Sequence, residues 1–315
     1  MLTVSRRFVR PVLALLSLTF GLGVAEGVAT LADGTLEFPT DGRRFSTRAG
    51  EHGTNRRGLH ERELAEVPPT GVRRFVVLGD SMTWGTGTAA QAWPRLAETH
   101  LGPPWESVNL SHYGYDAEQS LATLQTFGWR YGPDAVVFAT YGNDLVPTEL
   151  ITVGDAAMPA WVGGDGRGLG RWSLGRRFEG AVRARGFAEL ENPERYRAAL
   201  VGLRDAAAAA GVPLFVVVLH PHVLAEPDPI ACDRQAGAPD RCAGALARAR
   251  SQVRMLEELA IPHLDILAAL QAGPARSWFG ENASDWEHPS PEGHALIGVA
   301  VAEWLRPLLP AAPAR

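Results

Sequence analysis

The sequence contains no lysine, so all 30 of its basic side chains are arginine. Together with the high content of alanine, glycine and proline, this reflects a coding bias rather than a mechanism. The 30 basic and 35 acidic side chains leave a formal net charge of −5. A chain with this balance has no general attraction to nucleic acid, and no nucleic-acid partner is expected.

Cysteine is also scarce, because Cys232 and Cys242 are the only two in 315 residues. No Cys-x-x-Cys pair or second pair of ligands lies nearby, which argues against a zinc site. We therefore expect no zinc site at these cysteines. The two thiols lie in one polar stretch that contains Pro and Gly, and they can close a small disulfide in an oxidising compartment. The alternative of two free surface thiols stays open at this point.

One long hydrophobic run is present, from Val12 to about Leu31, and a single glutamate interrupts it. Three arginines precede it, which is typical of a signal peptide or a signal anchor. We expect residues 1–32 to be one of the two, and slightly favour a membrane anchor whose positive end stays in the cytoplasm. Either interpretation places the main domain outside the cytoplasm, membrane-anchored or secreted, and favours a bond between the two cysteines.

The rest of the chain has the composition of a globular protein, with 46% hydrophobic and 21% charged residues. Residues 33–73 are rich in Gly, Arg, Thr and Pro, and we expect an extended connector there. Within it, residues 55–60 can form a local turn that docks on the domain. From residue 74 to about 310 the pattern alternates between strands and helices. Residues 145–190 have no clean periodicity, and we expect an insertion there that shapes a binding pocket.

Short apolar runs rich in β-branched residues predict strands that are buried on both faces. Such runs lie at residues 75–78, 135–139 and 214–219, and short strands are also expected at 107–110 and 263–266. Apolar residues at helical spacing predict helices between them, at residues 91–101, 116–127, 193–210 and 243–260, and from 291 onwards. Strands that alternate with helices pair in parallel through right-handed crossovers. The expected fold class is α/β, a three-layer α/β/α sandwich with a central parallel sheet of about five strands.

The stretch Gly79-Asp80-Ser81-Met82-Thr83-Trp84-Gly85 directly follows the first predicted strand. Open α/β sheets bind ligands beyond the carboxyl ends of their strands, so Ser81 can present its hydroxyl and backbone N–H to a pocket. The alternative is that Ser81 only caps the next segment. Polar residues also follow other strands at 109–114 and 140–144, and residues 285–289 precede the last helix.

These residue types fit the hydrolysis of an ester, which requires a nucleophile, a base and hydrogen-bond donors for the oxyanion. Ser81 can be the nucleophile and His288 the base. Asp285 lies three residues before His288 and can hold its imidazole ring, or it can be a cap near the helix.

The donors for the oxyanion can come from three places. The backbone N–H groups of Ser81 and Gly114 and the side-chain amide of Asn143 are the candidates, and glycine at 114 permits a close approach of the backbone. Asp80 and Asp144 are expected to support the turns that carry Ser81 and Asn143.

In their order along the chain, these segments resemble the four blocks of the SGNH/GDSL hydrolase family. Residues 79–85 match Gly-Asp-Ser-x-Thr-x-Gly, Gly114 matches the second block, and residues 285–289 match Asp-x-x-His-Pro. The third block, Gly-x-Asn-Asp, is Tyr-Gly-Asn-Asp at 141–144, so its glycine is displaced by one position. The resemblance covers about residues 74–306. It implies a flavodoxin-like α/β/α sandwich and a serine ester hydrolase that forms an acyl-enzyme without a metal or a cofactor.

Other activities stay open beside hydrolysis. The same residues can serve an extracytoplasmic O-acyltransferase or a deacetylase that acts on glycans, so the expected substrate is a small or glycan-linked acyl ester. A metallophosphoesterase is a remote alternative, since His220-Pro221-His222 resembles one of its motifs but no Asp-x-His precedes Gly79. Either His220 or His222 can instead line the pocket. The third class is a non-catalytic binding module.

Overall fold

The computed structural model describes residues 53–85, 87–145, 191–236, 240–272 and 287–309, residues 21, 22 and 24, and the backbone of strands 150–153 and 156–159. Almost all of them belong to one compact unit, Pro39–Val162 with Leu190–Arg315, and a second unit comprises Met1–Phe38 and Gly163–Glu189. Most of the N-terminal segment, the connector up to residue 52, Asp285 and most of the insertion lie outside the described residues. No helix in the described ranges is long and apolar enough to cross a membrane.

Five parallel strands form the central sheet, which confirms the predicted fold class. They are β1 (Arg73–Leu78), β2 (Trp105–Asn109), β3 (Ala135–Thr140), β6 (Leu214–Val218) and β7 (His263–Asp265), in the order β2-β1-β3-β6-β7. The chain leaves β1 toward one side of the sheet to form β2 and then crosses to the other side to form β3. The carboxyl ends of β1 and β3 therefore flank a topological switch point, where sheets of this kind bind ligands.

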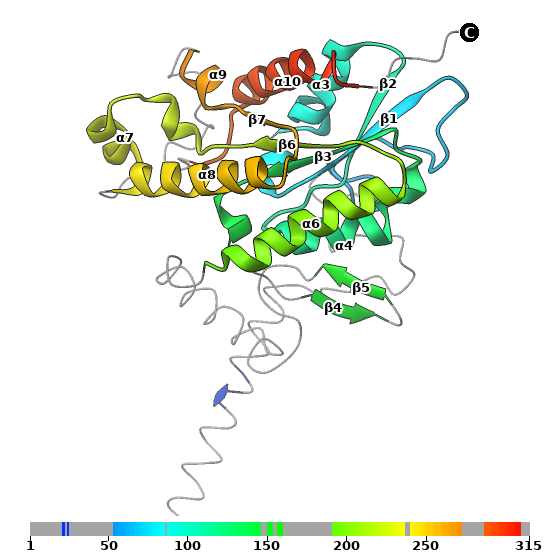
Figure 1. Cartoon of the computed structure of the whole chain (residues 1–315), viewed down its shortest axis with the longest axis horizontal. Coiled ribbons are helices and arrows are strands. Elements are labelled where there is room, and N and C mark those ends of the chain that lie inside the picture. Colours follow the sequence, from blue (N-terminus) through cyan, green and yellow to red (C-terminus); the bar gives the residue numbers. More distant parts are fainter. Residues whose placement is uncertain are drawn as a thin grey trace, which may run out of the picture. The chain divides into compact units, whose positions relative to one another are not determined.

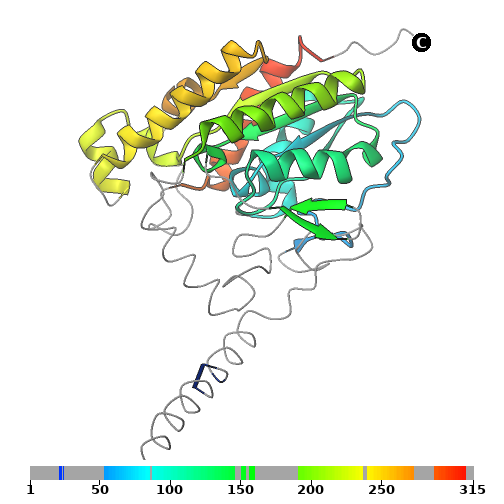
Figure 2. The ribbon, with the colours of Figure 1, turned by 60° about the horizontal axis from the view of Figure 1, so that its bottom comes forward.

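Helices cover both faces of the sheet, because successive side chains of each strand point to opposite faces. Phe75 and Val77 of β1 pack in one apolar cluster, and Val76 and Leu78 pack in another. The first cluster includes residues of α3 (Trp93–Leu101) and α10 (Pro291–Leu305). The second includes residues of α4 (Ala117–Thr126), α6 (Pro193–Ala209) and α8 (Arg241–Glu258). Figure 1 shows these two layers with the sheet between them, and Figure 2 shows α4, α6 and α8 lying along one face.

Three of the long helices begin at polar caps that the sequence indicates. The side chain of Asp116 accepts a hydrogen bond from the Gln119 N–H at the start of α4. Asn192 and Ser290 do the same at the starts of α6 and α10, where a proline follows each cap. These caps satisfy N–H groups that have no partner within the helix, so they fix where each helix starts.

Several short elements go beyond those expected from the sequence. They are α2 (Ser81–Trp84), η2 (Ala89–Gln91), η3 (Gly128–Tyr131), η4 (Gly142–Leu145), β4 (Leu150–Val153), β5 (Ala156–Pro159), η7 (His222–Ala225), α7 (Pro229–Ala236) and α9 (Leu267–Ala272). Strands β4 and β5 form an antiparallel hairpin inside the expected insertion, beside α4. Most of these elements are too short to show a helical or strand period in the sequence.

Cys232 and Cys242 lie in two helices, α7 and α8, rather than in a polar loop, and they form a disulfide in the structure. Both are buried and pack against Val223, Leu224 and Leu270. The bond closes a short loop across a sequence separation of 10. The bond therefore ties α7 to α8.

Removing this bond should destabilise the folded chain. For a loop of this length, we expect Cys232→Ser with Cys242→Ser to lower the free energy of unfolding by about 2–3 kcal/mol. Guanidinium denaturation followed by circular dichroism measures the change. A reducing agent should shift the midpoint of the wild type in the same direction and leave that of the double variant unchanged. Equal midpoints for the oxidised wild type and the double variant would contradict the prediction.

Candidate active site

Ser81 lies directly past the carboxyl end of β1, as the first residue of α2. The chain turns there at Gly79, whose φ is +152°. A Cβ atom at this position would lie 2.8 Å from Oγ1 of Thr83 and 2.9 Å from the carbonyl oxygen of Ala139, so only glycine fits. Asp80 then caps α2, because its Oδ1 accepts a hydrogen bond of 2.9 Å from the Met82 N–H. These two neighbours fix the place of Ser81 at the edge of the sheet.

His288 lies against Ser81 although 207 residues separate them in the sequence. Its Nε2 is 2.8 Å from Oγ of Ser81, which is a normal hydrogen-bond distance. The preceding residue is also held, since the carbonyl of Glu287 accepts a hydrogen bond from the His222 N–H. Both Ser81 and His288 are partly exposed, so the pair is open to a substrate. A serine and a histidine in this arrangement can exchange the hydroxyl proton.

Gly114 and Asn143 lie on the loops that follow β2 and β3, on either side of β1 in the sheet. Gly114 has a φ of +66°, which a residue with a side chain rarely adopts. The amide nitrogen Nδ2 of Asn143 donates to the carbonyl of Tyr115 at 3.3 Å and so ties the two loops together. The loop of Gly114 is also joined to β1, because the His112 N–H donates to the carbonyl of Gly79. The structure thus brings Ser81, Gly114 and Asn143 to one edge of the sheet.

Asp80 and Asp144 are both buried beneath this edge. Asp144 accepts hydrogen bonds from the Thr140 hydroxyl at 2.8 Å and the Tyr141 N–H at 2.7 Å, which shapes the turn that carries Asn143. Burial, with the nearby charge of Asp80, raises the pKa of Asp144 well above its usual range. Burial also raises the pKa of Asp80 to about 7, although the Met82 N–H, His288 and Asn143 act against this rise.

The displaced glycine of the third block, Gly142, lies beside the side chain of Arg248. A Cβ atom at Gly142 would lie 3.1 Å from Nε of Arg248, so this side chain occupies the space next to the backbone. Arg248 in turn lies 3.6 Å from a carboxylate oxygen of Glu191. Tyr141, which stands where the family pattern has its glycine, packs against the apolar face covered by α3 and α10.

The other histidines near this edge are deeply buried and differ from His288 in their surroundings. Burial lowers the pKa of His112 to about 4. Burial and the proximity of His288 and His60 lower the pKa of His294 to about 3, and its Nδ1 accepts a hydrogen bond from the Trp93 N–H. These rings are therefore neutral at physiological pH. His220 contacts Asp265 at 2.6 Å, and burial tends to raise the pKa of that carboxyl, but the His220 contact outweighs it and lowers the pKa.

The described ranges contain no group of three or more His, Cys, Asp or Glu side chains that could hold a metal ion. His60 and Asn109, which the sequence places only within the polar segments 55–60 and 109–114, also reach this edge. The His60 ring and the Asn109 amide both contact α2, the helix that begins with Ser81. In the sequence, a polar turn ahead of Leu59 and His60 is the one local sign that this segment docks.

Several solved structures have a similar fold. For three of them, the match covers most of this chain and nearly all of the other chain. The lipase/acylhydrolase from Enterococcus faecalis has 14% sequence identity and a TM-score of 0.49, and the match covers 77% of this chain and 100% of that one. The aryl esterase of M. smegmatis has 16% identity, a TM-score of 0.46, and coverage of 76% and 100%. A carbohydrate acetylesterase family member from Sinorhizobium meliloti has 14% identity, a TM-score of 0.46, and coverage of 76% and 99%.

No curated protein matches the sequence. The family model described as GDSL-like Lipase/Acylhydrolase matches residues 75–301, which is more than two thirds of the chain. The matched range includes most of β1, all of α2, and the residues Ser81, Gly114, Asn143 and His288. The chain therefore belongs to the GDSL-like lipase/acylhydrolase family, and it is a hydrolase that acts on esters.

Proposed function

We propose that the protein is a serine esterase in which Ser81 is the nucleophile, His288 the general base, and Asp285 the residue that orients the His288 ring. The observation that carries this proposal is the 2.8 Å contact between Nε2 of His288 and Oγ of Ser81, at the switch point of the sheet. Asp285 lies outside the described residues, and its role rests on its spacing from His288 in the sequence.

The proposed reaction begins when Oγ of Ser81 attacks the carbonyl carbon of the ester and its proton passes to Nε2 of His288. The resulting oxyanion accepts hydrogen bonds from the backbone N–H groups of Ser81 and Gly114 and from the Asn143 amide. His288 then gives its proton to the leaving alcohol, and the acyl group stays on Ser81. Water attacks this acyl-enzyme with His288 again as the base, which releases the acid. These steps use only groups of this chain, so the proposal includes no metal or cofactor.

The proposed location is outside the cytoplasm, either anchored by the N-terminal segment or secreted after its cleavage. The apolar run at 12–31 with its basic flank supports this proposal. The Cys232–Cys242 disulfide supports it independently, because such bonds persist in oxidising compartments.

Turnover of p-nitrophenyl esters tests the proposed function. We expect hydrolysis of acetate and butyrate esters, with less activity toward long chains, because no long apolar segment that could serve as a lid stands between the predicted strands in the sequence. Products are also measured with an added glycan acceptor, since the partly exposed Ser81 and His288 can equally serve acyl transfer. If an acylated glycan formed faster than the free acid, the protein would be an acyltransferase rather than a hydrolase. A folded protein that turned over none of these esters would contradict the proposal.

Asn143 offers a test of the proposed oxyanion donors. We expect Asn143→Ala to lower kcat by about 10²–10³-fold with little change in KM, because the amide acts mainly on the charge of the transition state. Its hydrogen bond to Tyr115 is also lost, and this should cost only about 1 kcal/mol of stability.

The matched control for this prediction is Asn143→Asp, which keeps the shape and replaces a donor by an acceptor. Its kcat should fall at least as far as that of Asn143→Ala, because a carboxylate repels the developing oxyanion. Steady-state kinetics and thermal denaturation of both variants make the comparison. A change confined to KM would remove Asn143 from the set of oxyanion donors.

A further inference from the structure

Helix α2, which carries Ser81, is too short to hold its own shape. It has four residues, and the backbone bonds at its ends run from the Trp84 N–H to the Asp80 carbonyl and from the Gly85 N–H to the Ser81 carbonyl. The last carbonyl groups of any helix lack partners within the helix. In α2 these include the carbonyls of Thr83 and Trp84, so their partners must come from elsewhere in the protein.

Two side chains from outside the helix supply these partners. Nδ2 of Asn109, the last residue of β2, donates to the Thr83 carbonyl at 3.2 Å. Nδ1 of His60 lies 2.7 Å from the Trp84 carbonyl, and because that oxygen can only accept, the ring nitrogen is the donor. The His60 ring also stacks on the Trp84 indole, with ring centres 5.1 Å apart and planes 12° from parallel. Both contacts of His60 thus hold the end of the helix that begins with Ser81.

His60 is buried and belongs to a segment that we call the strap, residues 53–66. Asn55 organises its turn. Its Oδ1 accepts hydrogen bonds from the N–H groups of Arg57 and Leu59, and its Nδ2 donates to the Arg62 carbonyl. The conformation that presents His60 to Trp84 is therefore fixed within the strap itself.

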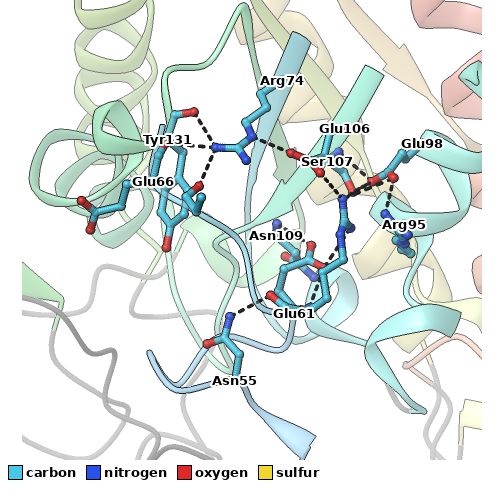
Figure 3. Close-up of polar contacts among 12 residues, drawn as sticks. Asn55, Glu61, Glu66, Arg74, Arg95, Glu98, Glu106, Ser107, Asn109 and Tyr131 are labelled. Carbon is cyan, nitrogen blue, oxygen red and sulfur yellow. Dashed lines mark hydrogen bonds and ion pairs between the residues drawn. The ribbon is translucent and has the colours of Figure 1, made fainter. Parts of the chain in front are cut away.

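Charged contacts fasten the strap to the sheet (Figure 3). Arg62 forms ion pairs with Glu61, with Glu98 of α3 and with Glu106 of β2. The buried Glu61 also accepts a hydrogen bond from the Asn109 N–H at 3.2 Å. Asn109 is the second residue that holds α2, so the strap and β2 support this helix as one connected network.

We propose that His60 is a positioning residue for the esterase reaction, which keeps Ser81 in place by holding the Trp84 end of α2. This inference rests on the proposed function of Ser81. The match to the family model begins at residue 75, so it does not cover His60 or the strap. The catalytic unit therefore extends further toward the N-terminus than the family match.

An imidazole ring suits this place, because it is both flat enough to stack and able to donate a hydrogen bond. Burial lowers the pKa of His60, while its backbone contacts with Trp84 and Gly87 act in the opposite direction. Phenylalanine at this position would retain the stacking on Trp84 without the donated hydrogen bond. Glutamine would retain a donor but lose the stacking.

Kinetics of variants in the full-length chain test the inference. We expect His60→Phe to lower kcat for p-nitrophenyl acetate by about 10- to 100-fold with KM within about twofold, because small displacements of a reacting group are costly. His60→Gln should recover part of the lost kcat. The matched control is Leu203→Ala, which removes a buried leucine of α6 from the same apolar cluster as Leu59, outside the strap and outside α2. It should lower the melting temperature and leave kcat near that of the wild type.

The rate at which a fluorophosphonate labels Ser81 provides a second readout that needs no natural substrate. We expect the wild type to be labelled, His60→Phe to be labelled more slowly, and Leu203→Ala to be labelled at the wild-type rate. Equal rates in the wild type and His60→Phe would overturn the positioning role, and so would a loss of kcat in Leu203→Ala as large as in His60→Phe. If the wild type itself is not labelled, the proposed function fails rather than this inference.

Discussion

Replacing Ser81 by alanine should lower kcat for ester hydrolysis by about 10⁴-fold or more, and His288→Ala should have a similar effect. Each change removes one partner of the 2.8 Å contact between Oγ of Ser81 and Nε2 of His288. Because the two groups act as a unit, the kcat of the double variant should be no lower than that of the less active single variant. Steady-state turnover of p-nitrophenyl acetate by all three variants measures this non-additivity.

We do not expect the loss of kcat in these variants to result from misfolding. Ser81 is partly exposed, and removing its hydroxyl leaves the cap at Asp80 and the supports of α2 in place. Ser251→Ala on α8 is a matched control, since it makes the same substitution in a partly exposed residue of another helix. All variants should unfold near the wild-type temperature, and the control should keep full activity. If Ser81→Ala retained more than a tenth of the wild-type kcat, another group would have to be the nucleophile.

The sequence contains local signals for the sheet and for the place of Ser81. Residues 75–78 are apolar without a polar break, and Gly79 follows, so both the buried strand and the turn after it can be predicted. The caps at Asp116, Asn192 and Ser290 are local signals as well, because a side chain there bonds a backbone group three residues on. The family pattern adds the order of the four blocks, which brings together residues as distant as Ser81 and His288.

The support of α2 could not be predicted from such patterns. The contact of His60 with Trp84 spans 24 residues and that of Glu61 with Asn109 spans 48, and neither follows a helical or strand period. Glu61 also lies in a charged run, which is typical of a solvated surface, yet its carboxylate is buried between Arg62 and a backbone N–H. The turn at residues 55–60 indicates docking but not the surface on which it docks.

Arg74 should be the most costly side chain of this network to remove, and Figure 3 shows its contacts. It is 1% exposed, pairs with Glu106 at 2.7 Å and donates to the carbonyl groups of Ala65, Glu66 and Tyr131. Arg74→Met would leave these carbonyls without their donor and Glu106 with Arg62 as its remaining ion pair. Removing one partner of a buried ion pair is expected to lower the free energy of unfolding by about 3–5 kcal/mol.

Guanidinium denaturation of Arg74→Met at pH 7 measures this cost, and Arg204→Met is the matched control. Arg204 makes an exposed ion pair with Asp205, and its loss should cost less than about 1 kcal/mol. A cost for Arg74→Met no larger than that of the control would show that the buried network contributes little to stability.

The cost of Arg74→Met should also depend on pH. Burial tends to raise the pKa of Glu106, but the hydrogen bonds from Arg74 and Arg62 outweigh it and lower this pKa below its usual value of 4.5. The stabilisation by the ion pair is therefore fully present above pH 4.5 and is lost as the pH falls through the lowered pKa in the folded state. The difference in unfolding free energy between the wild type and Arg74→Met should shrink over this acidic range. Arg74 lies about 13 Å before the carboxyl end of β1, at roughly 3.3 Å per residue. It also holds the carbonyls of Ala65 and Glu66 in the strap, so the folded variant should lose no more kcat than His60→Phe. A variant with normal stability and low kcat would instead mean that the network serves the active site more than the fold.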